Sequence, residues 1–310
     1  MQEIIPAVSK DKIVSELTRD KFIRNTNYGK NEIYVVTAHN SPNIMIEIGR
    51  LREIAFRNGG GGTGKSADID EYDTNETPYS QLIVWDPEEK EITGGYRFLH
   101  LKQVGFDENN KLKLATTKLF HFSETFITDY KPYTIELGRS FVQPKYQSTK
   151  AGRKALFALD NLWDGLGSLV VDNPDVKYFF GKVTMYSHFN KTARDMILYF
   201  MKTIFPDTEK LLYPHNPLLL ETSEAVLSAL FNGTNYYTNH KILSAKVREL
   251  NENIPPLINA YMNLSSTMKT FGTAINDHFG GVEETGIMIK ISDIYPEKKE
   301  RHITTYISDK

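Results

Sequence analysis

The stretch Tyr133-Thr-Ile-Glu-Leu-Gly-Arg-Ser-Phe-Val-Gln-Pro-Lys-Tyr146 decides the predicted fold. Its first ten residues are rich in β-branched and aromatic side chains, which predicts a strand, and Pro144 ends that strand. Glu136 and Arg139 lie within the same apolar run, where an unpaired buried charge is costly. The stretch therefore predicts a central strand that carries two functional charges.

The chain becomes basic directly after this strand. A helical pattern then runs from 151 to 171. A strand that leads through a basic turn into a helix N-terminus is suited to binding an anion. We therefore expect an anionic donor or its carrier to bind at Lys145, Lys150, Gly152, Arg153 and Lys154.

Composition limits the possible classes of protein. The 310 residues are 40% apolar and 12% aromatic, which suits one large or two small globular domains. The absence of cysteine excludes disulfides and cysteine nucleophiles, and a net charge of −2 argues against a general nucleic-acid binder. Without a signal peptide or a membrane span, we expect a cytoplasmic protein, with peripheral contact at the inner face of the membrane left open.

Hydrophobic periodicity predicts an α/β order of elements with a helical insertion. We expect an N-terminal part, 1–43, packed on one domain, 44–310, in which 206–256 is the insertion. A glycine-rich turn is expected before the last strand. The expected helices are 9–24, 44–57, 151–171, 192–205 (capped by Thr192 and Asp195), 237–250 and 257–268, and the expected strands are 32–38, 81–86, 91–101, 133–142, 178–186 and 285–292.

The segment Gly59-Gly-Gly-Gly-Thr-Gly-Lys-Ser66 satisfies the phosphate-loop pattern GxxxxGK[ST]. A working phosphate loop follows a buried strand and opens a helix, so that backbone amides converge on the phosphates. Here the glycines follow a helical pattern and lead into acidic sequence. We therefore expect a mobile surface loop that binds no nucleotide.

An acidic segment with Asp68, Asp70 and Asp73 follows this loop and precedes a predicted hairpin. Such spacing is compatible with a helix cap, a solvated turn or a metal site, and we expect no bound metal. Arg97 lies in the middle of the second hairpin strand, so it should share a sheet with Glu136.

Taken together, the order Arg52-x-x-x-Phe56, Asp68-x-Asp-x-x-Asp73, Gly94-Gly-Tyr-Arg97 and Glu136-x-x-Arg139 resembles acyl-homoserine-lactone synthases. It resembles more closely the ornithine-lipid and glycine-lipid N-acyltransferases of the GNAT superfamily, often labelled "hemolysin". The resemblance implies a GNAT-like mixed, mostly antiparallel sheet flanked by helices. It also implies transfer of an acyl group, 3-hydroxylated or not, from acyl carrier protein to the amine of a small amino acid, in aminolipid biosynthesis.

Amide formation needs a neutral amine, so a carboxylate must accept a proton. Glu136 is the first candidate for this base, and Asp70 and Asp73 come next. A cationic partner for the acceptor's carboxylate is expected from Arg52, Arg97 or Arg139. Further substrate-binding residues are expected at Phe56, Asp68, Ser140 and Phe141. No bound cofactor is expected, and a CoA thioester remains possible as donor.

Two departures from the family pattern matter. The GNAT pyrophosphate turn is not met by residues 147–154, which favours a donor gripped less through a nucleotide. Glu136 and Arg139 are three apart, so they face opposite ways unless a bulge at Gly138 brings them together. A CoA-dependent N-acetyltransferase and a non-catalytic module that binds lipid or carrier protein remain as alternatives.

Overall fold

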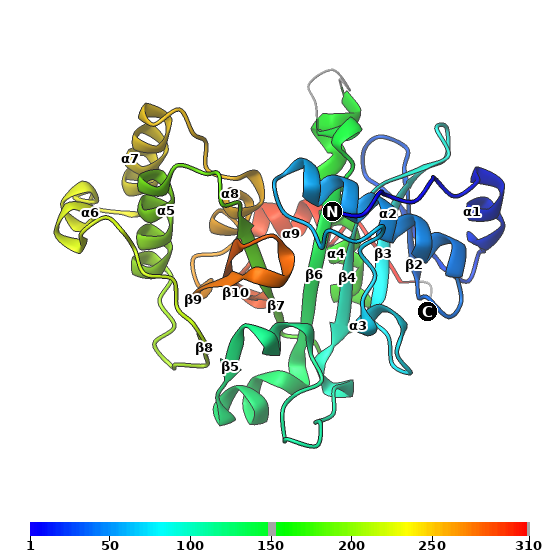
Figure 1. Ribbon diagram of the computed structural model, residues 1–310, viewed down its shortest axis with the longest axis horizontal. Helices are drawn as coiled ribbons and strands as arrows, with labels where there is room; N and C mark the ends of the chain where they lie inside the picture. Colours follow the sequence, from blue (N-terminus) through cyan, green and yellow to red (C-terminus); the bar gives the residue numbers. More distant parts are fainter. Residues whose placement is uncertain (148–152, 309–310) are drawn as a thin grey trace.

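A mixed sheet of eight strands forms the centre of the protein, in the order β1-β2-β3-β4-β6-β7-β10-β9 (Figure 1). The computed structural model describes residues 1–147 and 153–308, and for residues 153–156 it describes the backbone only. Neighbouring strands are antiparallel except β6 and β7, which confirms the mixed, mostly antiparallel sheet. The strands are β1 (Phe22–Asn25), β2 (Glu32–Val36), β3 (Ser80–Asp86), β4 (Glu91–His100), β6 (Thr134–Val142), β7 (Tyr178–Met185), β9 (Lys269–Asn276) and β10 (Val282–Lys290), and β5 (Phe120–Phe122) pairs separately with β8 (Leu212–Pro214).

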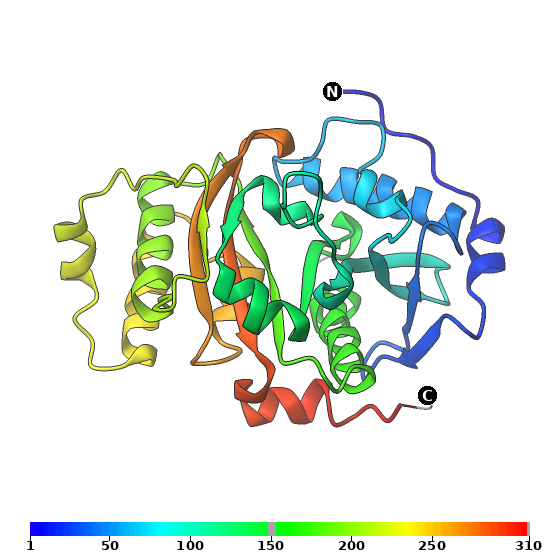
Figure 2. The same ribbon diagram turned by 90° about the horizontal axis from the view of Figure 1, so that it is seen from below.

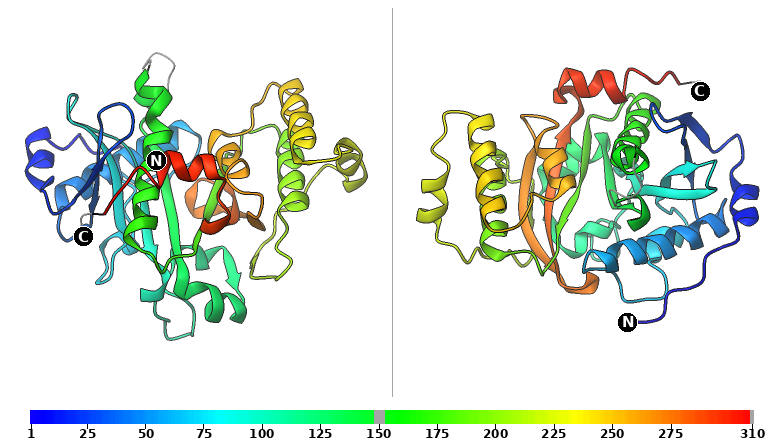
Figure 3. Two further views of the ribbon diagram at one scale, coloured as in Figure 1. Left: turned by 180° about the vertical axis from the view of Figure 1, so that it is seen from behind. Right: turned by 90° about the horizontal axis from the view of Figure 1, so that it is seen from above.

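Helices cover both faces of the sheet. Figure 2 and Figure 3 show α2 on one face, α4 on the other, and α5, α6 and α7 beyond the β9 edge. The helices are α1 (Lys10–Glu16), α2 (Pro42–Asn58), α3 (Glu71–Thr74), α4 (Arg153–Asp172), α5 (Lys191–Ile204), α6 (Glu224–Leu230), α7 (Tyr236–Glu249), α8 (Pro256–Met262) and α9 (Pro296–His302). Short helical turns are η1 (Leu101–Gln103), η2 (Ala115–Lys118), η3 (Phe126–Tyr130), η4 (Lys131–Tyr133), η5 (Pro144–Tyr146), η7 (Asp277–Phe279) and η8 (Ile291–Asp293).

Alternation along the strands separates the apolar side chains into two main cores. On β3, Leu82 packs in the core that holds Leu162 of α4, whereas its neighbour Ile83 packs with Ile48 of α2. Successive strand residues point to opposite faces, so two such layers follow directly from the sequence. A third core, which includes Phe126 and Phe180, lies under residues 101–133.

The parallel strands β6 and β7 separate part of the way along. Their pairing covers only Thr134–Leu137 and Tyr178–Gly181. Next to the last pair, Gly181 lies so close to β6 that an added Cβ would be 2.6 Å from the carbonyl oxygen of Leu137. Beyond this point the strands leave a gap in the sheet.

A β-bulge lies at the start of this gap. Gly138 faces Arg97 and Phe141 faces Gly95, so Arg139 and Ser140 together face one residue of β4. Arg139 has φ +48°, a left-handed conformation that is uncommon for residues other than glycine. The bulge expected at Gly138 is therefore one residue further along, and it turns Arg139 to the face that carries Arg97 and Glu136.

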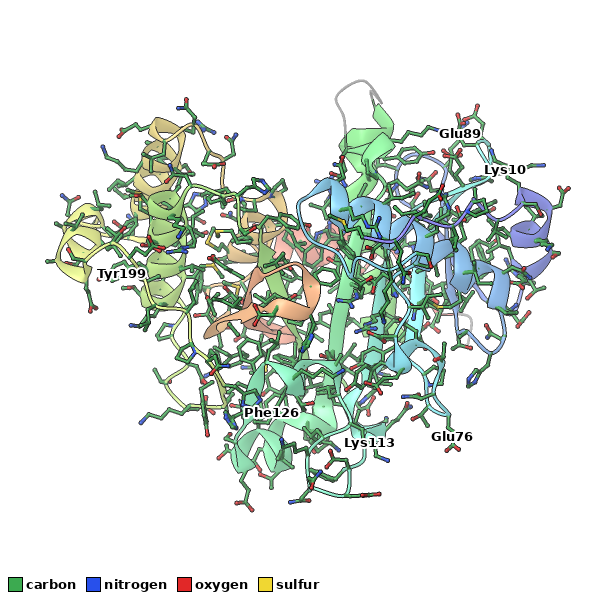
Figure 4. The ribbon with its side chains drawn as sticks, viewed as in Figure 1. Lys10, Glu76, Glu89, Lys113, Phe126 and Tyr199 are labelled. Carbon is green, nitrogen blue, oxygen red and sulfur yellow. The ribbon has the colours of Figure 1, made fainter. Side chains whose placement is uncertain are left out.

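The N-terminal region differs from the expected helix 9–24. Helix α1 ends at Glu16, and Phe22–Asn25 forms the edge strand β1, where Phe22 packs on Tyr34 of β2 with ring centroids 5.6 Å apart. The amphipathic pattern was compatible with both forms, and pairing with the next strand, β2, decided for the strand. Figure 4 shows Lys10 of α1 beside Glu89, whose backbone oxygen accepts a bond from Lys10 Nζ at 2.6 Å.

Two further expectations need correction. Helix α5 is capped by Asn190, which accepts from the backbone N–H of Ala193 at 3.1 Å, whereas Asp195 is buried beside Arg194. The helix expected to run to 268 ends at Met262, and strand β9, which was not expected, begins at Lys269. The glycine-rich turn expected before the last strand is present at Gly280 and Gly281, between β9 and β10.

Candidate active site

A cavity of about 490 Å³ occupies the gap between β6 and β7. On the α2 side of the sheet, its lining carries the charged residues Arg139, Lys182 and Glu284 among aromatic side chains such as Phe56 and Phe279. Its lining on the opposite side is apolar, with Leu159 of α4 and Leu257 of α8. One site thus offers charges for a polar headgroup and an apolar surface for a hydrocarbon chain.

Arg139 connects the cavity with the acidic segment. Its Nε lies 2.8 Å from Oδ2 of the fully buried Asp68, and its terminal nitrogen lies 3.7 Å from Asp70. Its guanidinium also lies 4.3 Å from the ring centroid of Phe279. The strained backbone and these contacts hold one cationic side chain at the cavity wall, an arrangement typical of functional sites.

The other two predicted arginines lie in a closed ion-pair network behind the cavity. Arg52 is fully buried, with its terminal nitrogen 3.2 Å from Asp73, and it also donates to Gln81. Arg97 lies 2.9 Å from Asp70 and 3.3 Å from Asp73. Burial raises the pKa of Asp73, but Arg52 and Arg97 outweigh burial and lower this pKa well below its usual range.

The acidic segment also caps a helix, one of the alternatives that the sequence left open. The side chain of Asp70 accepts from the backbone N–H of Tyr72 at 3.0 Å, and Asp73 accepts from the backbone N–H of Asp70 at 3.1 Å. Together these bonds form a capping box at the start of α3. Asp70 and Asp73 therefore have structural partners that account for their positions.

Glu136 lies on the same face of the sheet but not on the cavity wall. Its carboxylate accepts from the hydroxyl groups of Tyr79 and of Thr116, the latter at 2.7 Å. Burial raises the pKa of Glu136, although Tyr79, Thr116 and Arg97 act in the opposite direction. Glu136 is not one of the described residues that line the gap cavity.

The remaining predicted site residues are those expected to bind the substrate and those expected to bind the donor or its carrier. Phe56, Ser140 and Phe141 line the cavity. The ammonium of Lys145 lies 2.9 Å from Glu91, so this lysine is already paired. Lys150 and Gly152 lie outside the described residues, and Arg153 and Lys154 open α4 with side chains that are not described.

Lys182 and Glu284 are cavity residues that the sequence reading missed. Lys182 Nζ lies 2.7 and 2.8 Å from the two carboxylate oxygens of Glu284. Lys182 lies in β7, whose other residues are mostly apolar, and Glu284 lies in β10 beside Glu283. A charge in a buried strand was the signal that identified Glu136 and Arg97, and it could have found Lys182, whereas Glu284 lies just before the expected strand 285–292.

The glycine-rich segment makes contacts with the rest of the protein that the sequence did not predict. The buried carboxylate of Glu53 accepts from the backbone N–H groups of Thr63 and Gly64 at 3.0 and 2.8 Å. An added Cβ at Gly59 would lie 2.5 Å from the ring of Tyr186. These two amides are directed at an internal carboxylate.

A family model matches the middle of the chain. Residues 51–156 match the family model described as Acetyltransferase (GNAT) domain. The solved structure of the AHL synthase LasI is similar with a TM-score of 0.42 and 10% identity, covering 90% of this chain and 98% of that one.

Two relatives cover nearly the whole chain. A protein of Bacteroides thetaiotaomicron named glycine N(alpha)-acyltransferase is 59% identical over 99% of this chain and 91% of its own length. A protein of Phocaeicola vulgatus with the same name is 57% identical over 99% of this chain and 94% of its own length. The chain therefore belongs to this family of N-acyltransferases, enzymes with a GNAT domain.

Proposed function

We propose that the protein transfers a fatty acyl group from the phosphopantetheine thioester of acyl carrier protein to the amine of a small amino acid. The gap cavity carries this proposal, because it joins charged residues such as Arg139 to an apolar wall that includes Leu159. Glycine is the favoured acceptor and ornithine the second, since the relatives at 59% and 57% identity are named for glycine.

The acceptor's carboxylate is assigned to Arg139. A guanidinium offers two parallel donors to a carboxylate, and Arg139 is the arginine on the cavity wall among the three that the sequence pointed to. The backbone between Gly138 and Val142 has no pairing with β7, so N–H groups that face the gap can stabilise the thioester oxygen as charge develops. Glu136 stays a predicted base, which requires proton transfer through groups between it and the cavity.

Acyl carrier protein is the proposed donor, with acyl-CoA as the alternative. Residues 147–154 keep only one glycine of the usual GNAT pyrophosphate turn, Gly152, at altered spacing, which supports a donor held less through a nucleotide. The carrier would dock where α4 begins, at the basic residues Lys150, Arg153 and Lys154. Lys145 contributes less to this surface than expected, because Glu91 already neutralises it.

The product would be an N-acyl amino acid, an amphiphile that fits a role in aminolipid biosynthesis. The acyl chain, 3-hydroxylated or not, would be delivered in the cytoplasm or at the inner face of the membrane. In the part of the chain that the structure describes, no helix has the length and apolar character needed to cross a membrane.

The test supplies purified enzyme with acyl carrier protein or CoA thioesters of the same acyl chain, plus glycine, ornithine or other amino acids, at physiological salt. Mass spectrometry should detect N-acylglycine formed faster from the carrier thioester. Arg139→Gln should raise the KM for glycine, whereas the control Arg50→Gln, whose guanidinium pairs with Glu47 on its own helix, should not. Faster transfer from acyl-CoA, or acylation of non-amino-acid amines only, would contradict the proposal.

A further inference from the structure

Glu284 is the only residue with a carboxylate among the described residues that line the gap cavity. Its side chain is almost fully buried and accepts from Lys182 Nζ at 2.7 and 2.8 Å, from Asn276 Nδ2 at 2.9 Å and, in a longer contact of 3.5 Å, from Thr184 Oγ1. An ionised carboxylate offers about four acceptor positions, and a donor 3.5 Å away fills its position only weakly, so a ligand donor can replace Thr184 there. The cavity therefore contains a carboxylate that can receive a ligand cation.

A purely structural role explains this pair poorly. A buried ion pair is often no more stabilising than apolar residues of similar volume, because desolvation offsets the attraction. Lys182 and Glu284 also lie on a cavity wall, and Lys182 keeps 16% of its side chain exposed. Charged residues that line a cavity despite the free-energy cost of desolvation are candidates for ligand recognition.

Two cationic residues, Arg139 and Lys182, line the gap cavity together with Glu284. Burial raises the pKa of Glu284, but Lys182, Asn276 and Arg139 together lower it below the ordinary value. Glu284 is therefore ionised near neutral pH and lies within the electrostatic reach of Arg139. A carboxylate beside a cation matches an α-amino acid zwitterion, whose ammonium and carboxylate are separated by a single carbon.

We propose that Glu284 is a catalytic residue that binds the acceptor's ammonium and takes its proton, while Lys182 is a positioning residue that holds the Glu284 carboxylate toward the cavity. The inference rests on the proposed function, in which Arg139 binds the carboxylate of the same acceptor. It assigns the base to a residue that lines the gap cavity, whereas Glu136 is bonded to Tyr79 and does not line it.

The proton balance of the step is complete. Glu284 removes one proton from the ammonium, and the free electron pair of nitrogen attacks the thioester carbon. The C–N bond forms and the C–S bond breaks, so sulfur leaves as a thiolate and receives the second proton from nitrogen. Glu284 then returns its proton to solvent, and the products are an amide and a thiol.

The test compares two nucleophiles in the Glu284→Gln variant. With glycine, kcat/KM should fall by about a hundredfold or more, the loss expected for a general base. Aminooxyacetate keeps the carboxylate but has a nitrogen that is already neutral at pH 7, so its kcat/KM should fall less than tenfold. The control Glu283→Gln removes the adjacent carboxylate, which pairs with Arg194 at 2.8 Å and not with Lys182, and it should leave both rates nearly unchanged.

Lys182→Met provides a second readout that a structural role would not produce. Removing this cation raises the pKa of Glu284, so the acid limb of kcat/KM for glycine should move to higher pH. Equal losses with both nucleophiles in Glu284→Gln, or an unmoved acid limb in Lys182→Met, would overturn the inference. If Glu284→Gln turned over glycine within threefold of wild type, the inference would also be overturned, but the proposed function would stand. A wild-type enzyme that acylates no amino acid would refute the proposed function itself.

Discussion

Replacing Asp73 by Asn should destabilise the fold strongly, because Asp73 is the anionic centre of the buried network. Asp73 faces Arg52 at 3.2 Å and Arg97 at 3.3 Å, and it accepts from Gln81 Nε2 at 3.0 Å. Asn has nearly the same shape, so the change removes the charge without opening a cavity. Arg52, which is fully buried, then loses its nearest countercharge.

The size of the effect follows from this burial. Removing one partner of a buried pair costs about 3–5 kcal/mol. For a chain of 310 residues, 1 kcal/mol corresponds to roughly 1.5 °C in Tm, so Asp73→Asn should lower Tm by about 5–8 °C. Asp70→Asn is the matched control. The side chain of Asp70 is 26% exposed, Asn also caps helices well, and Arg97 still has Asp73 as a countercharge. For this variant we expect the free energy of unfolding to fall by about 1 kcal/mol.

The assay is thermal unfolding followed by circular dichroism across a pH series. The pKa of Asp73 is lowered in the folded state, so its stabilising contribution is present above its unfolded pKa and is lost as the pH falls toward the folded one. The difference in Tm between wild type and Asp73→Asn should therefore shrink on acidification. A Tm within about 1 °C of wild type, together with a large loss of turnover, would refute the structural role and make Asp73 a reaction-centre residue.

Three further predictions concern the other motifs. Lys65→Ala should leave turnover nearly intact, and isothermal titration of the wild type should detect no ATP binding, because the backbone amides of Thr63 and Gly64 already donate to Glu53. ATP binding by the wild type that Lys65→Ala abolishes would contradict this prediction. Glu136→Gln should not lower Tm at neutral pH. Burial raises the pKa of Glu136, so the contribution of this carboxyl group to stability falls as the pH rises above the ordinary pKa of the group. A loss of turnover of about a hundredfold would keep Glu136 as a candidate base, and normal turnover would exclude that role. Lys150→Glu combined with Lys154→Glu should raise the KM for acyl carrier protein and flatten its salt dependence with little change in kcat, and unaltered steady-state kinetics would remove this docking surface.

Much of the fold was predictable because its elements have strong local patterns. Helix α2, the hairpin of β3 and β4, and strand β7 agree with the expected ranges to within about two residues. Strands β1 and β9 were missed because they are defined by pairing with the neighbouring strands β2 and β10 rather than by a distinctive period. The amphipathic pattern at Phe22 suits a helix or a strand equally well until β2 lies beside it.

Part of the candidate site was also predictable from charges set in apolar strands. This signal identified Glu136, Arg97 and Arg139, and the structure brings them to one face of the sheet. It could not separate the charges that line the cavity from those that support it, because both kinds are buried in similar sequence. Lys182 carries the same signal, but Glu284 lies just before the expected last strand and is paired with Lys182 only because β7 and β10 are adjacent.

The sequence by itself determined which residues carry charge within buried strands and in what order those strands occur. The tertiary structure alone decided where each charge points. In a strand, a shift of one residue moves a side chain to the opposite face, so the bulge at Arg139 and Ser140 determines that Arg139 reaches Asp68 and the cavity. The separation of β6 and β7 likewise depends on long-range pairing, which ends at Leu137 and Gly181 and so leaves room for a substrate.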